Sequence, residues 1–346
     1  MIQVLRLQGT PREVGRQYGE ACREGFRAFH ARVRELAQEH NEWCDEIHVM
    51  GEAIASHYPR YYQELAGMAE GANLTLDEAL LNHRRLLLAE FTCCTNIAFF
   101  NTPAGPILGK NLDGAPSQPN DPDYNFIARH VRYENGQEIV HTTIVGDLMS
   151  RDTCLNVRGL AFGGSSVGSV FQKSLRNPTL EAGLYEMICS CATVPEAIAF
   201  LRRYPYVGKG YNFVFVDAQG QGVVLEVACP LVQVRQPEPG EDVIFCTNHY
   251  NLPALLHADR RPPLGMEYSQ KRFRFLQRKL YQERAPRTVE QIKALLSAYG
   301  PQGGLCRPID DGDPSVTAMS VVARPQEGRF EVAYGRPCEV AYERVL

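Results

Sequence analysis

The chain has 346 residues, of which 44% are hydrophobic and 22% charged, a composition typical of a globular protein with a core of its own. The net charge is −4 and the sequence has no long cluster of Lys and Arg, which argues against a nucleic-acid partner. No apolar run reaches the length of a signal peptide or a membrane span, so the sequence predicts a cytoplasmic protein with no membrane partner.

Helical signals dominate the first ninety residues. Residues 10–13 (TPRE) form a capping box with proline at the first helical position, and apolar residues recur after it at helical spacing as far as Leu36. This pattern predicts one long amphipathic helix. A second capping box at residues 75–78 (TLDE) opens a helical segment that is expected to end near Leu88.

From Thr92 onward, strand patterns take over. The segment 92–113 reads as a strand, a turn at Thr102 to Gly105 and a second strand. Further strands are expected at 126–133, 138–146, 160–163, 243–246, 316–323 and 329–334, a hairpin at 211–227, and helices at 179–203, 267–282 and 288–298. Strand runs separated by helices fit two antiparallel sheets between helical layers, so the fold class expected is α+β with four α/β/β/α layers.

Eleven cysteines are present, a high and odd number. In a reducing compartment most of them are expected to act as small buried hydrophobic residues. There is no CxxC pair, and the nine histidines lack the spacing of a zinc site, so no metal is expected.

Two adjacent cysteines lie where the helical part ends. Cys93 and Cys94 open the first strand of the predicted hairpin, and Asp113 lies at the end of its second strand. Because the start of one hairpin strand lies beside the end of the other, we expect Cys94 and Asp113 to be neighbours in space.

Cysteine attacks as a thiolate, so it needs a base nearby. The predicted hairpin contains no histidine for this task. A cysteine at a chain N-terminus carries its own base, because its α-amine titrates near about pH 8. Cys94 would gain that amine only if the bond after Cys93 is broken, so self-cleavage and catalysis would use one thiol.

The segment 94–113 resembles the start of the mature chain in the N-terminal-nucleophile (Ntn) hydrolases. There, Cys-Thr opens the catalytic chain and a Gly-(Arg/Gln/Lys)-Asn-(hydrophobic)-Asp motif follows one hairpin later. It is most similar to the acyl-coenzyme A:6-aminopenicillanic acid acyltransferase family (peptidase family C45), with choloylglycine hydrolases and penicillin V acylases more distant. Further similar segments are 210–218, 247–250, 305–307 and 335–337.

This resemblance implies a role for each matching residue. Cys94 would be the nucleophile, and Asp113 would hold its amine. Asn248 would donate its side-chain amide to the oxyanion that develops during acyl transfer. Lys110 occupies the position where the choloylglycine hydrolases have arginine, and Arg307 is a candidate charged partner deeper in the site.

Substrate contacts are expected from Asn111, Ser166 and Tyr250, which lie in or beside these segments. Ser166 closes the stretch 162–166, where the choloylglycine pattern leads to expect an oxyanion-hole asparagine. A hydroxyl or a backbone amide would have to serve there instead.

Three alternatives stay open. Cys93 stands where the acyltransferases usually have glycine, a residue that tolerates a strained scissile bond better, so Cys93 could itself be the reacting thiol. The chain could also be an uncut cysteine amidase or peptidase with His249 or another histidine as base. In the third alternative, it is a non-catalytic Ntn-fold binding protein in which Cys93 blocks processing.

The resemblance implies a four-layer Ntn sandwich whose helical fragment, residues 1–93, stays associated with a catalytic fragment, residues 94–346. The activity implied is hydrolysis or transfer of an acyl group at a carbon–nitrogen amide bond of a small molecule. An amide or acyl-thioester substrate is the expected partner. No cofactor is expected, with acyl-coenzyme A as a candidate co-substrate. The acyl group, the amine, and the choice between primary metabolism and natural-product tailoring stay open.

Overall fold

The computed structural model describes residues 2–85, 87, 93–114, 125–149, 153–169, 174–300, 303–308 and 315–346. Two β-sheets form its centre. In spatial order, the eight-stranded sheet consists of β1 (Gln3–Gly9), β4 (Phe126–Tyr133), β5 (Glu138–Ile144), β6 (Thr153–Asn156), β7 (Leu160–Val167), β8 (Gly210–Asp217), β9 (Gly222–Ala228) and β10 (Leu231–Arg235). The six-stranded sheet consists of β11 (Val243–Cys246), β2 (Cys93–Phe99), β3 (Ile107–Gly114), β12 (Val316–Arg324), β13 (Arg329–Tyr334) and β14 (Glu343–Arg344).

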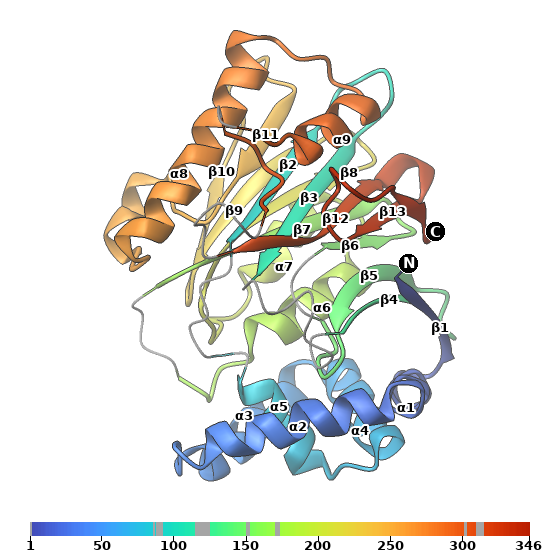
Figure 1. Cartoon of the computed structure of the whole chain (residues 1–346). Helices are drawn as coiled ribbons and strands as arrows, with labels where there is room; N and C mark the ends of the chain where they lie inside the picture. Colours follow the sequence, from blue (N-terminus) through green and yellow to red (C-terminus); the bar gives the residue numbers. More distant parts are fainter. Residues whose placement is uncertain are drawn as a thin grey trace.

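Helices lie outside both sheets, and Figure 1 shows those of the first ninety residues at one end of the molecule and α8 and α9 at the other. The α-helices are α1 (Pro11–Ala21), α2 (Arg23–Ala37), α3 (Trp43–His57), α4 (Pro59–Ala72), α5 (Leu76–Arg85), α6 (Leu180–Ser190), α7 (Val194–Leu201), α8 (Pro263–Gln277) and α9 (Val289–Ser297). Shorter helical turns are η2 (Pro253–Ala258), η3 (Arg278–Gln282) and η4 (Pro325–Glu327). In the part of the chain described here, no helix is long and apolar enough to span a bilayer.

Three hydrophobic cores fill the spaces between these layers. In the largest core, helices α1 through α7 pack against the outer face of the eight-stranded sheet. A second core fills the space between the two sheets, and a third joins α8 and α9 to the outer face of the six-stranded sheet. The order of layers is therefore helices, sheet, sheet, helices, and the predicted α+β four-layer sandwich is confirmed.

Most local predictions are also confirmed. The Thr10 side chain accepts from the backbone of Glu13, whose carboxylate accepts from Thr10 in return, and Thr75 and Glu78 form the same reciprocal pair. The strands at 126–133, 243–246 and 329–334 have the expected bounds.

Two predictions for the N-terminal segment are wrong. The single long helix is two helices, because Cys22 leaves helical geometry (φ −121°, ψ 22°). The segment is also not wholly helical, since β1 lies at the edge of the eight-stranded sheet, parallel to β4. Its partner lies more than a hundred residues further along the chain, beyond what a local pattern can reveal. The expected helix end near Leu88 lies outside the described residues.

The N-terminal helices share a buried ion pair with the rest of the chain. Glu64 on α4 and Arg129 on β4 are both 0% exposed and in hydrogen-bonding contact at 2.5 Å. Tyr133 and Tyr185 donate their hydroxyls to the same carboxylate, and burial raises the pKa of both phenols well above the usual value. Residues 1–93 and 94–346 therefore share both a sheet and a core.

Candidate active site

The hairpin of β2 and β3 sets the geometry of the site. Cys93 pairs with Asp113 and Cys94 with Leu112 in the antiparallel register. The expected proximity of Cys94 and Asp113 is observed along the backbone, but Asp113 lies directly opposite Cys93, and the side chains of Cys94 and Asp113 point to opposite faces of the sheet.

Successive side chains of a strand point to opposite faces, so the two thiols differ in their surroundings. Cys94 belongs to the core between the two sheets. Further along β2, Ile97 and Phe99 pack in the core under α8 and α9. Cys93 has the same parity as these residues and as its partner Asp113, so its side chain lies on the helix-covered face.

Asn248 holds the backbone amide of Cys94. The Cys94 N–H donates to Asn248 Oδ1 at 2.7 Å, and Asn248 Nδ2 donates to the carbonyl of Ser166 at 2.9 Å. The Asn248 N–H donates to Ser269 Oγ at 2.8 Å, which ties the segment after β11 to α8. These bonds fix the asparagine beside the bond between Cys93 and Cys94.

Arg272 of α8 reaches the same place from the helix side. Its Nη1 donates to the Cys94 carbonyl and, at 2.8 Å, to Thr95 Oγ1. Its Nη2 donates to Asn248 Oδ1 at 2.9 Å. A single buried guanidinium thus contacts three groups around the start of β2.

A second guanidinium comes from Arg261, just before α8. Its Nε donates to the Asn248 carbonyl at 2.7 Å and its Nη2 to the Ser166 carbonyl at 2.9 Å. Its Nη1 lies 3.8 Å from Cys93 Sγ. Arg261 therefore braces the asparagine and faces the first thiol at once.

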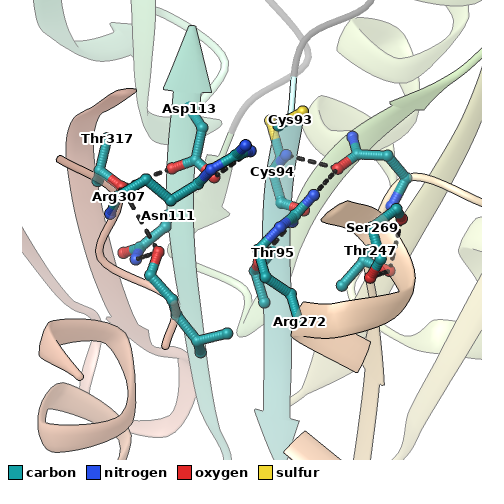
Figure 2. A network of polar contacts seen from close by, with 12 residues as sticks. Cys93, Cys94, Thr95, Asn111, Asp113, Thr247, Ser269, Arg272, Arg307 and Thr317 are labelled. Carbon is teal, nitrogen blue, oxygen red and sulfur yellow. Dashed lines mark hydrogen bonds and ion pairs between the residues drawn. The ribbon is translucent and has the colours of Figure 1, made fainter. Parts of the chain in front are cut away.

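Asp113 is completely buried and contacts Thr317 and Arg307 among the described residues. Thr317 Oγ1 donates to its Oδ1 at 2.7 Å, and Arg307 Nη1 lies 3.7 Å from its Oδ2 (Figure 2). Burial raises the pKa of this carboxyl, and the charges of Arg307 and Arg272 oppose that rise. The backbones of Arg307 and Thr317 are also paired, so Arg307 is held against the end of β3.

The thiol of Cys93 lies in a strongly positive environment. Burial by itself would raise its pKa, but the guanidiniums of Arg272, Arg307 and Arg261 outweigh burial and lower the pKa to about 7. Cys93 is thus a thiol that ionises near neutral pH.

The remaining expected site residues are spread more widely. Lys110 is buried on β3 opposite Asn96. Asn111 donates its side-chain amide to the carbonyls of Leu296 and Leu305, each at 2.9 Å. The Asn111 amide thus links β3 to the segments that flank the C-terminal end of α9. These contacts do not support the expected role of Asn111 in substrate binding.

Two other expected substrate contacts have a structural explanation. Ser166 lies beside the site, but it is its backbone carbonyl that contacts Asn248 and Arg261. Tyr250 is buried in a separate small core and donates its hydroxyl to the Val227 carbonyl at 2.7 Å. Its ring is therefore part of the packing beside β9.

His249 has partners that the sequence did not reveal. Its Nδ1 lies 2.8 Å from Ser269 Oγ and 3.2 Å from Thr247 Oγ1. Burial, together with Arg272 and Arg261, lowers its pKa to about 4. The imidazole is consequently neutral at neutral pH and a weak base.

Sequence reasoning missed Arg261 and Arg272. For Arg272 the sequence held a signal, because Ser269, Arg272 and Leu276 recur at helical spacing within a predicted helix. In the structure all three side chains are buried. A charged residue on the apolar face of a helix indicates a buried polar partner. Arg261 stands in a loop and had no such signal.

A cleft of about 1020 Å³ opens beside the site, between α8 and residues 299–300 and 303–308. Arg272 and Arg307 form part of its wall. Within the described ranges, no three His, Cys, Asp or Glu side chains are grouped as metal ligands would be.

Residues 100–328, more than half of the chain, match the family described as acyl-coenzyme A:6-aminopenicillanic acid acyl-transferase. The chain belongs to this acyltransferase family. The matched range includes Asp113, Asn248, Arg272 and Arg307, and it begins after the two cysteines.

Individual relatives are more distant. The 40 kDa form of acyl-coenzyme A:6-aminopenicillanic-acid-acyltransferase from Emericella nidulans is 28% identical over 122 residues, 32% of this chain and 33% of the relative. The match thus spans a third of that relative's length. Penicillin V acylase from Agrobacterium tumefaciens is a similar solved structure, with 15% identity, a TM-score of 0.46 and coverage of 70% of this chain and 83% of that chain. A mutant conjugated bile acid hydrolase from Clostridium perfringens has 13% identity, a TM-score of 0.43 and coverage of 70% and 89%.

Proposed function

We propose that the chain cuts itself between Cys93 and Cys94 and then uses Cys94 to hydrolyse or transfer an acyl group at a carbon–nitrogen amide bond. The observation that carries this proposal is the 2.7 Å hydrogen bond from the Cys94 N–H to Asn248 Oδ1. That nitrogen is the atom that becomes an α-amine on cleavage, and Asp113 lies across the hairpin from it. Membership of an acyltransferase family supports the reaction class.

Self-cleavage follows from the same contacts. The Cys94 thiolate attacks the carbonyl carbon of Cys93, a thioester forms, and the amide bond to the Cys94 nitrogen breaks. The released nitrogen takes up the proton that the Cys94 thiol gave up on becoming a thiolate. Water then hydrolyses the thioester, which leaves a carboxylate on Cys93 and the thiol and free amine on Cys94. Arg261, which lies 3.8 Å from Cys93 Sγ, and Arg272, which donates to the Cys94 carbonyl, place positive charge close to the bond that breaks.

Acyl transfer repeats this chemistry on a substrate. The α-amine of Cys94 accepts the thiol proton, and the thiolate attacks the acyl carbonyl. The leaving amine takes the proton from the α-amine. Water or another amine then resolves the acyl-enzyme, and the thiol is restored.

Asn248 has a place in both stages. A primary amide has two N–H donors, and one of them is used by the Ser166 carbonyl. The second donor serves the oxyanion, while Oδ1 holds the nitrogen of Cys94. Arg261 and Arg272 fix this orientation through the Asn248 carbonyl and Oδ1.

Cys93 is a second candidate for the reacting thiol. Its position directly opposite Asp113 and its pKa of about 7 favour it. Cleavage would then fall before Cys93. The spacing from Cys94 to the carboxylate motif of the family favours Cys94, and this is the assignment we adopt.

A histidine base is not favoured. His249 is neutral, hydrogen-bonded to Ser269 and lowered in pKa to about 4. An uncut amidase would need another base within reach of the thiols.

Trapping of the acyl-enzyme tests the proposal. Purified protein is exposed to a panel of N-acyl amides and acyl thioesters, and the mass of the large fragment is measured. An added acyl mass is expected on wild type and absent from Cys94→Ala, with Cys93→Ala as the matched control. Acylation that survives in Cys94→Ala and disappears in Cys93→Ala would reassign the nucleophile. A chain that no substrate acylates would support a binding protein.

A further inference from the structure

The cleft beside the site carries an unusual charge. Among its described lining residues, five are cationic: Lys271, Arg272, Arg274, Arg278 and Arg307. None of the described lining residues is acidic. The described lining of this cleft is therefore positively charged, although the chain as a whole has a net charge of −4.

These cations lie at different depths. Lys271 and Arg274 are exposed, Arg278 is half-buried, and Arg272 and Arg307 are buried. The two buried ones are those that reach the Cys94 carbonyl and Asp113. The positive lining thus leads from solvent to the groups around the cysteine pair.

Nearby acids offset only part of this charge. Lys271 pairs with Glu267 at 2.8 Å and Arg278 with Glu283 at 3.5 Å. Both pairs lie largely in solvent, where such pairs typically contribute about 0–1 kcal/mol. Arg274 contacts the neutral side chain of Gln270. Because these two pairs are solvent-exposed, a ligand that brings its own negative charge can compete with them for the cations at the mouth.

Aromatic residues complete the lining. The guanidinium of Arg307 lies 5.3 Å from the ring centre of Tyr268, and that of Arg278 lies 5.6 Å from the ring centre of Phe275. Stacking through its flat face leaves the edge of a guanidinium as a fork that suits carboxylate or phosphate oxygens. A cleft of about 1020 Å³ is large enough for a drug-sized molecule.

We propose that this cleft binds a part of the substrate that carries two or more negative charges, as carboxylates or phosphates. Lys271, Arg274 and Arg278 are its specificity-determining residues, and Arg272 and Arg307 link it to the reacting centre. The assignment to a substrate rests on the proposed function. It predicts a preference for acyl donors or amines with several anionic groups over neutral ones of equal size.

Binding of simple polyanions tests the cleft without any need for turnover. Pyrophosphate and citrate are titrated by calorimetry into the full chain as purified, with acetate as the monovalent comparison. Pyrophosphate and citrate are expected to bind, and their affinity should fall steeply with added salt. Tighter binding of pyrophosphate would indicate a phosphorylated substrate, and tighter binding of citrate a polycarboxylate.

The test variant is Arg274→Gln with Arg278→Gln, and the matched control is Arg27→Gln with Arg34→Gln on α2, which removes the same charge from an exposed surface elsewhere. The test variant should bind the polyanion at least about tenfold more weakly, since charge-assisted contacts are lost. The control should bind as wild type does. Lys271→Gln, a milder change, provides a second reading if the double variant is unstable.

Equal affinity in the test and control variants, or no binding by wild type, would overturn the proposal. This failure is separable from failure of the proposed function. An active enzyme that does not bind polyanions would refute only the proposal that the cleft binds an anionic part of the substrate. Polyanion binding by a chain that is never acylated at Cys94 refutes only the mechanism.

Discussion

At the scale of single residues, the environment of a thiol matters more than its place in the sequence. None of the eleven cysteines forms a disulfide, and only Cys44 and Cys338 are exposed. Burial raises the pKa of most of the buried thiols whose pKa is shifted. For Cys246, for example, burial raises the pKa to about 12. Cys93 differs because three guanidiniums face it, and its pKa falls instead.

The ionisation of Cys93 should be visible in its reactivity. In a Cys94→Ala background, which leaves one cysteine at this site, alkylation of Cys93 should increase with a midpoint near pH 7. Arg272→Met should move that midpoint upward, while Arg34→Met on α2 should not. An unchanged midpoint in Arg272→Met would show that this guanidinium does not set the pKa.

The same shift affects stability. The folded state holds the thiolate more readily than the unfolded chain, whose thiol has the ordinary pKa of 9.0. The thiolate's contribution is therefore fully present above pH 9 and is lost as pH falls through about 7. Denaturant titrations of Cys94→Ala should show the free energy of unfolding rising with pH across this window, and the Cys93→Ser change in that background should flatten the rise.

Asn248 should matter for turnover more than for folding. Asn248→Ala removes the acceptor for the Cys94 nitrogen and the oxyanion donor, and a lost donor of this kind typically costs about 10²–10³ in kcat. Asn251→Ala is the control, because the side-chain amide of Asn251 donates to the His249 carbonyl. A loss smaller than about tenfold in Asn248→Ala would remove the oxyanion role.

At the scale of elements, the site depends on which strands and helices meet. A hairpin is local, so the spacing of Cys94 and Asp113 was enough to predict their proximity. Asn248 and Arg272 come from beyond β11 and from α8, and they reach β2 because β11 pairs with β2 in the sheet. That pairing joins residues about 150 positions apart, and no local pattern encodes it.

The contact between α4 and β4 should hold the two fragments together. Glu64→Gln would leave Arg129 buried without its counter-charge, which typically costs about 3–5 kcal/mol. Glu20→Gln breaks an exposed pair with Arg16 and should cost at most about 1 kcal/mol. Thermal unfolding of the two variants compares these two losses of stability. Equal Tm values would show that the buried pair does not stabilise the contact between α4 and β4.

At the scale of the whole molecule, the sequence predicted the four layers because strand and helix periodicities are strong in the second half of the chain. It failed on β1, an edge strand whose parallel partner is remote. It predicted Arg307 as a site residue but missed Arg261 and Arg272, since charged residues in loops and helices are ordinarily expected at the surface. Only the folded chain shows that Arg261, Arg272 and Arg307 converge on one thiol.

The position of chain cleavage tests the central claim most directly. Intact mass and N-terminal sequencing of purified wild type, Cys93→Ala and Cys94→Ala would be compared. We expect two associated fragments in wild type, the larger beginning at Cys94, the same cut in Cys93→Ala and one uncut chain in Cys94→Ala. A wild-type chain that stays whole and still turns over substrate, or a fragment that begins at Cys93, would contradict the account.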